Sequence, residues 1–154
     1  MNPENDLVLL LTALSAGVDR QVRAALADRG FPDVRDSHGF VFQHLLLGPA
    51  RVSDLAVKLG MSPQGASKLT AEMERAGYVR RVTDQADQRN RLVELADRGR
   101  ELIEAGRRAR AEVNADLRAA LGESAGPFEA ALRALAERSG GLTELLSRRL
   151  RPRT

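Results

Sequence analysis

The sequence predicts a mainly α-helical protein that contains one small β-hairpin. Apolar residues recur at steps of three and four over most of the chain, which is the spacing of amphipathic helices. Between residues 78 and 95 the pattern changes to alternation, which is typical of half-buried strands. The 154 residues are 43% hydrophobic, which is enough for a sizeable core.

Two helices are expected before residue 50. An apolar stripe runs along residues 7–26, and the helix that carries it should end at Gly30 and Pro32. A second helix is expected at about 37–47, and Gly48-Pro49 should stop it. The first stripe has no cation before it, unlike a secretory leader, and it is too short to span a membrane. We therefore expect a cytoplasmic protein that makes no membrane contact.

The segment 51–76 has the spacing of two short helices joined by a tight turn. Ser53 is expected to cap the first helix and Gly60 to form the turn, while Ser62 and Pro63 begin the second helix as N-cap and first residue. This pattern predicts a helix-turn-helix, whose second helix enters the major groove of DNA. The residues of this helix that we expect at the DNA are Ser62, Pro63, Gln64, Ser67 and Lys68.

Two predicted strands follow directly after Gly77. Residues 78–82 should pair with residues 91–95, and about eight residues should join them, which is long for a hairpin. A hairpin directly after a recognition helix is a wing, and an arginine near its tip can enter the adjacent minor groove. We assign that role to Arg89, with Asp87 orienting its guanidinium and Arg91 contacting a phosphate. The alternative is that Asp87 caps the turn and the arginines are solvated.

The last third of the chain is expected to be helical again. One long helix should follow Ala96 and end at Gly122, another should carry leucines up to Gly140, and a short one should cover about 142–150. The terminal helices carry more leucines than a small monomer can bury, so we expect a second copy to cover them. The residues assigned to this dimer contact are Leu7, Leu11, Leu14, Val18, Leu142, Leu145 and Leu146.

Several kinds of chemistry are not expected. The chain has no Cys, which excludes disulfides, thiolate nucleophiles and cysteine zinc sites. His38 and His44 are six residues apart and so face different sides of a helix, which argues against a metal site or another cofactor. The triplet Asp36-Ser37-His38 has the residue types of a catalytic triad, but neighbours in sequence rarely face one substrate. We therefore do not expect an enzyme.

Three stretches of the chain resemble the MarR family of winged helix-turn-helix transcription regulators. They are VSDLAVKLGMS, SKLTAEMERAGYVRR and DQRNRLVELADRGREL, in which Asp87-x-Arg89 matches the wing signature of the family. Ala96 departs from the pattern, because the family usually has Thr at this position. The resemblance implies an obligate homodimer with intertwined terminal helices and a pseudo-palindromic DNA site. It also implies a small lipophilic or phenolic ligand, which members of the family often bind between the dimer helices and the DNA-binding lobe.

These observations predict one MarR-like domain over residues 1–154. Residues 50–96 should form the winged helix-turn-helix lobe that binds DNA, and residues 1–49 and 97–154 should form the dimerisation helices and their support. The expected function is that of a homodimeric, sequence-specific regulator of transcription, a repressor that a small lipophilic or phenolic ligand releases from double-stranded DNA. Two alternatives stay open: a helical protein-interaction module that does not bind DNA, and a regulator that is controlled without a ligand.

Overall fold

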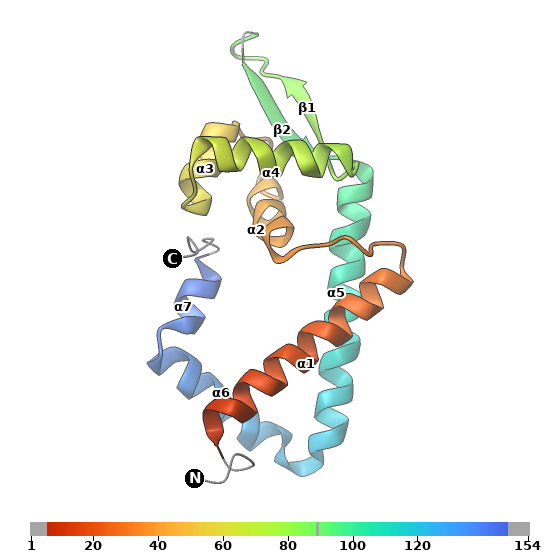
Figure 1. The fold of residues 1–154 in the computed structure, drawn as a ribbon, viewed down its shortest axis with the longest axis vertical. Coiled ribbons are helices and arrows are strands. Elements are labelled where there is room, and N and C mark those ends of the chain that lie inside the picture. Colours follow the sequence, from red (N-terminus) through yellow and green to blue (C-terminus); the bar gives the residue numbers. More distant parts are fainter. Residues whose placement is uncertain (1–5, 89, 148–154) are drawn as a thin grey trace. The chain divides into compact units, whose positions relative to one another are not determined.

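The computed structural model describes residues 6–88 and 90–147. It is mainly helical with one two-stranded antiparallel sheet, which confirms the predicted fold class (Figure 1). The elements in order are α1 (Leu7–Asp28), α2 (Asp36–Leu45), α3 (Val52–Leu59), α4 (Pro63–Arg75), β1 (Val79–Thr83), β2 (Arg91–Leu95), α5 (Asp97–Leu121), the 3₁₀ helix η2 (Gly122–Ser124), α6 (Ala125–Arg138) and α7 (Gly141–Leu146). Within those two ranges, no helix is long and apolar enough to cross a membrane.

The chain divides into two compact units. We call the first the helical unit, because it combines α1 with Glu104–Gly122, which is most of α5. We call the second the winged unit, because Arg35–Ile103 includes α2, α3, α4 and the hairpin. Helices α6 and α7 pack on each other and are grouped with the winged unit.

In the helical unit, α1 begins and ends where the sequence predicts. The carboxylate of Asp6 caps α1 by accepting the backbone N–H groups of Val8 and Leu9. Gly30, at a φ of +87°, turns the chain after the helix. The guanidinium of Arg29 then binds both carboxylate oxygens of Glu112 on α5, at 2.5 and 2.7 Å. This bidentate pair joins the end of α1 to α5.

The winged unit has its core under the helix-turn-helix and the hairpin. The buried side chains come from α2, α3, α4 and both strands, and they include Val41, Leu55, Leu59, Ala66, Met73, Val79, Val93 and Leu95. Gly60 adopts the left-handed conformation, with φ +64°, which makes the predicted tight turn between α3 and α4. The strands pair from Val79 opposite Leu95 to Thr83 opposite Arg91.

Two local predictions were wrong. Ser53 does not cap α3, because the helix already begins at Val52 and its N-cap is Arg51. The physical reason is a short bridge: Ala50 exchanges two backbone hydrogen bonds with Val93 of β2, so the chain stays extended through Arg51 and the helix starts directly after it at Val52. The first strand was also placed one residue too early, since β1 covers Val79–Thr83.

Candidate nucleic-acid interface

The N-terminus of α4 is built as its sequence predicts. Ser62 is the N-cap, and its hydroxyl oxygen accepts the backbone N–H of Gly65 at 3.1 Å, while Pro63 is the first helical residue. A Cβ added to Gly65 would lie 3.2 Å from both the Met61 Cε and the Ser62 Oγ. This crowding gives a reason within the chain for a glycine at this position.

The outer side of α4 is free for contacts with another molecule. Ala66, Leu69, Thr70 and Met73 form its buried side. The exposed residues of its first two turns are Pro63, Gln64, Ser67 and Lys68. These side chains are small or polar, and an amide, a hydroxyl and an ammonium group are the groups that bind base edges and phosphates.

A buried histidine joins α2 to α4. The Nδ1 of His38 accepts the backbone N–H of Arg35 at 3.3 Å, so its proton is on Nε2, which lies 3.3 Å from Oε1 of Glu72. Arg35 binds the same oxygen at 3.1 Å. Burial of the imidazole lowers the pKa of His38 below 6.5, although the Glu72 carboxylate acts in the opposite direction. The neutral ring therefore holds α4 against α2 at neutral pH, a contact that the sequence spacing did not reveal.

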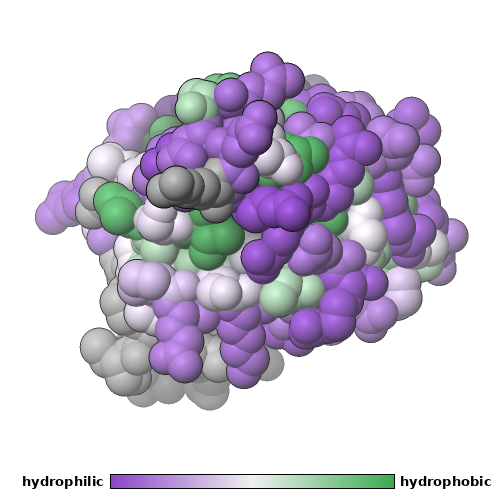
Figure 2. All heavy atoms as spheres, turned by 90° about the horizontal axis from the view of Figure 1, so that it is seen from above, coloured by the Kyte–Doolittle hydropathy of each residue, from purple (hydrophilic) through white to green (hydrophobic). Residues whose placement is uncertain are grey.

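Hydrogen bonds join Asp87 and Asn90 in the loop between β1 and β2. The amide nitrogen of the Asn90 side chain donates to a carboxylate oxygen of Asp87 at 2.7 Å, and the Asn90 backbone N–H donates to the Asp87 carbonyl at 2.9 Å. Arg91 is exposed, and its Nη1 lies 3.3 Å from the Thr83 hydroxyl across the hairpin. Arg89 lies outside the described residues, so its pairing with Asp87 stays a prediction. Seen from the wing, the surface is mainly hydrophilic (Figure 2).

A family model and solved structures agree with this geometry. Residues 33–90, which include the helix-turn-helix and most of the wing, match the model of the MarR family. A MarR family protein from Bacillus stearothermophilus has a similar structure, with a TM-score of 0.59 and 25% identity over 90% of this chain and 98% of that chain. By these matches, the chain is similar to proteins of the MarR family.

Other solved structures match this chain over most of its length. The YusO protein of Bacillus subtilis has a TM-score of 0.70 and 21% identity, and the match covers 88% of this chain and 94% of that one. MepR of Staphylococcus aureus, in a mutant form bound to an oligodeoxyribonucleotide, has a TM-score of 0.60 and 22% identity over 88% and 95% of the two chains. MepR bound to ethidium bromide also matches, with a TM-score of 0.59 and 21% identity over 94% and 99%. No curated protein sequence matches.

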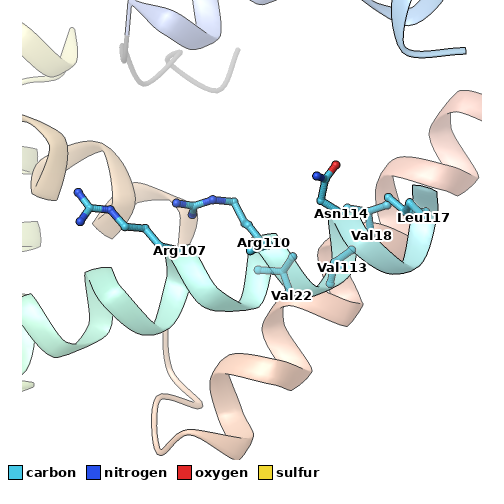
Figure 3. A pocket seen from close by; sticks show the side chains of 8 residues that line it. Val18, Val22, Arg107, Arg110, Val113, Asn114 and Leu117 are labelled. Carbon is cyan, nitrogen blue, oxygen red and sulfur yellow. The ribbon is translucent and has the colours of Figure 1, made fainter. Parts of the chain in front are cut away.

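The helical unit contains a hollow of about 520 Å³ between α1 and α5. Its wall is lined by Val18, Val22, Arg107, Arg110, Ala111, Val113, Asn114 and Leu117 (Figure 3). Figure 3 shows Arg107 and Arg110 extending from α5 in the same direction. Arg107 pairs with Glu104, whereas Arg110 makes no hydrogen bond or ion pair to the part of the chain that the structure describes. An apolar wall with an available guanidinium suits a small organic anion.

The terminal helices expose many large apolar side chains. Of the residues assigned to dimerisation, Leu7, Leu11, Leu14, Leu145 and Leu146 are exposed, and Val18 and Leu142 are half-buried. The same helices expose Val8, Leu9, Leu10, Phe128, Leu132 and Leu135. Soluble monomers rarely expose apolar patches of this kind.

No group of acidic, histidine or cysteine side chains within residues 6–88 and 90–147 is arranged to hold a metal ion. The two histidines differ in their surroundings, since His38 is buried and His44 is half-buried on α2.

Proposed function

We propose that this chain is a MarR-family, sequence-specific regulator of transcription that binds double-stranded DNA as a homodimer. The observation that carries the proposal is the exposed polar side of α4, which stands on a helix-turn-helix directly before a wing. MepR, which has the same fold, was solved with an oligodeoxyribonucleotide bound, and this supports the proposal. An exposed acidic or apolar face on α4 would favour the alternative of a protein-interaction module, but Gln64, Ser67 and Lys68 stand there instead.

Each exposed residue of α4 has a proposed partner on DNA. Gln64 can form two hydrogen bonds with adenine in the major groove, and Lys68 can reach guanine or a phosphate. Ser67 donates to a phosphate, and Ser62 and Pro63 bring the helix end close to the backbone. In the wing, Arg89 enters the minor groove with Asp87 as its partner, and Arg91 contacts a phosphate.

A homodimer would place two such lobes on one DNA molecule. The exposed leucines of α1, α6 and α7 supply an apolar surface that a second copy can cover. Two-fold symmetry then requires a pseudo-palindromic operator with half-sites about 34–36 Å apart or a multiple of that distance. A dimer bound across a promoter excludes the polymerase, so we propose that the chain acts as a cytoplasmic repressor.

Selection of bound fragments from a random DNA pool tests this proposal directly. The expected result is an enriched palindrome whose half-sites are one helical turn, about 10 base pairs, or a multiple of that apart. Enrichment of a single unrepeated site would overturn the dimer, and the absence of any enrichment at low salt would overturn DNA binding itself.

We further propose that a small organic anion with an apolar body releases the repressor from DNA, and that the hollow in the helical unit binds it. The guanidinium of Arg110 would hold the acid group, and Val22 and Leu117 would contact the apolar body. The resemblance implied a different place for the ligand, between the dimer helices and the DNA-binding lobe, and that place stays a prediction. Ligand binding can change DNA affinity only if it prefers one state of the protein.

Thermal shift and DNA release assays with aromatic carboxylic acids test this site, with aromatic cations of the same size as comparison. We expect the acids to raise the melting temperature and release DNA, and Arg110→Gln to abolish both effects. Arg108→Gln is the matched control, because it removes the same charge from α5 outside the hollow. Equal responses of the two variants would argue against this site, and no response to any compound would favour a regulator that is controlled without a ligand.

A further inference from the structure

Arg51 occupies a position where an arginine is locally unfavourable. It is the N-cap residue of α3, with φ −72° and ψ 147°, and its side chain makes no capping hydrogen bond. Ser, Thr, Asp and Asn are preferred at N-caps, because their side-chain oxygens accept the free N–H groups of the first turn. The positive end of the helix dipole also repels a cation there. The local structure of α3 therefore does not explain this residue.

The guanidinium of Arg51 reaches the base of the wing. Its Nη2 lies 3.1 Å from Oδ2 of Asp84, the residue that follows β1. Asp84 is the more enclosed partner, since 13% of its side chain is exposed against 45% for Arg51. The other carboxylate oxygen of Asp84 accepts the N–H of Ala86 at 2.9 Å, and the backbone N–H of Asp84 donates to the Asn90 carbonyl at 3.0 Å.

Asp84 is ionised at neutral pH and holds both sides of the loop. The N–H of Ala86 and, after it, the guanidinium of Arg51 hold the pKa of Asp84 below its usual value. The same residue therefore bonds to the start of the loop, to the end of the loop at Asn90 and to the start of α3.

The backbone before Arg51 is fixed to the same hairpin. The N–H of Ala50 donates to the carbonyl of Val93 at 3.0 Å, and the N–H of Val93 donates to the carbonyl of Ala50 at 2.8 Å. The start of α3 is thus bound to β2 through its backbone and to the end of β1 through the side chain of Arg51.

We propose that the ion pair between Arg51 and Asp84 is a positioning clamp that fixes the direction of the wing relative to the helix-turn-helix. The described part of the loop, residues 84–88 and 90, then meets the DNA already oriented, and less conformational entropy is lost on binding. Neither residue touches DNA in this role; they act through the wing. The inference rests on the proposed DNA binding. Because the pair is partly exposed, its loss should weaken operator binding by about two- to five-fold.

A direct phosphate contact is the competing role for Arg51, and Asp84→Asn distinguishes the two. Asn keeps an oxygen for the N–H of Ala86, but its amide nitrogen cannot accept from Arg51. If the ion pair is a positioning clamp, this variant binds the operator about two- to five-fold more weakly, although the loss of a negative charge by itself favours DNA binding. If Arg51 instead binds phosphate, Asp84→Asn releases it and affinity stays equal or rises, which would overturn the clamp.

Asp54→Asn is the matched control. It removes the same charge from the first turn of α3, and Asp54 has no hydrogen-bonded or ionic partner in the described residues. Affinity should be unchanged or slightly higher. If Asp54→Asn weakened binding as much as Asp84→Asn does, the effect would be general and the clamp would be wrong.

Arg51→Ala provides a second readout. It should weaken binding as much as Asp84→Asn, the double variant should be no weaker than the single ones, and the slope of affinity against salt should not change. A slope reduced by about one would identify a lost phosphate contact and overturn the clamp. Replacing residues 84–90 by Asn-Gly, which forms a tight hairpin turn, removes Asp84. In that background, Arg51→Ala should leave operator affinity unchanged.

These measurements separate the inference from the function on which it rests. Binding of the selected operator by the unmodified chain is measured first, and its absence would contradict the proposed function alone. If the unmodified chain binds and Asp84→Asn binds equally well, only the clamp is wrong. Melting curves of each variant establish that it is folded at the assay temperature, so that a loss of affinity reports on the wing.

Discussion

At the scale of single residues, Gly99 is the position where the fold allows least change. It lies in the first turn of α5, and a Cβ added there would be 2.1 Å from the carbonyl oxygen of Tyr78. The N–H of Ala96 donates to the same carbonyl at 3.0 Å, so the oxygen cannot move away without breaking that bond. We expect Gly99→Ala to lower the free energy of unfolding by about 1–3 kcal/mol or more, measured by urea unfolding.

Gly39→Ala is the control for this prediction. Gly39 is an exposed residue inside α2, and nothing lies within 4 Å of the position of its Cβ. Alanine favours the helix over glycine by up to about 1 kcal/mol, so this variant should be more stable than the unmodified chain. The close approach of α5 to Tyr78 would be contradicted if both substitutions had the same effect.

His38 should make stability depend on pH. Burial lowers the pKa of His38 in the folded state below 6.5, so the unfolded chain binds the proton first as the pH falls. Well above 6.5, the ordinary pKa of histidine, both states are neutral and the full stability is present. Below it the free energy of unfolding should decrease until the pH has fallen through the folded pKa. His38→Gln, which keeps a donor for Glu72, should reduce this slope in urea unfolding at a series of pH values, and an unchanged slope would assign the effect to other groups.

At the scale of secondary structure, the sequence predicts most elements because their signals are local. Periodicity located the long helices and the hairpin, and Ser62-Pro63 and Gly77 marked both ends of α4, since caps and turns depend on a few neighbouring residues. The start of α3 was wrong because a bridge to Val93, more than forty positions away, decides it. A local signal cannot contain a contact of that kind.

The candidate site likewise combines features that follow from local sequence with contacts between distant residues. The spacing of α4 predicted which of its residues would be exposed, because helical periodicity fixes the two sides of a helix. The contacts that hold α4 and the wing in place join distant residues: His38 with Glu72, and Arg51 with Asp84. Residues of opposite charge and single histidines occur in most sequences, so nothing in the spacing identified these pairs.

The recognition helix leads to a prediction at the same scale. Gln64→Ala should relax the base preference at one position in each half-site, at a cost of about 1–3 kcal/mol, because the amide can read one adenine. Lys68→Ala should reduce the salt slope if its partner is a phosphate. Arg75→Ala, in the last turn of α4, is the control and should leave the base preference unchanged. Binding to a library of operator variants measures all three, and an unchanged preference in Gln64→Ala would show that the register of the helix on DNA is different.

At the scale of the whole molecule, the exposed apolar residues are concentrated on a few helices. Leu7 to Leu14 on α1, and residues of α6 and α7, account for eleven of the fourteen large apolar side chains that are exposed in the described part of the chain. The other three are Leu46, Leu47 and Val57 in the winged unit. A surface of this kind on separate helices suits a contact between two copies better than a single ligand site.

The last prediction concerns this assembly. Leu11→Asp combined with Leu14→Asp places two charges in the proposed contact, and a charge that is buried without a partner is strongly unfavourable. The variant should be monomeric in light scattering at micromolar concentration, and it should lose specific operator binding because a single lobe makes half of the contacts. Its circular dichroism should still show folded helices, since both leucines are exposed in the single chain. Leu47→Asp is the control: Leu47 is 80% exposed but lies in the winged unit, so the dimer should remain. A double variant that stays dimeric, or an unmodified chain that is monomeric at this concentration, would show that these leucines do not join two copies.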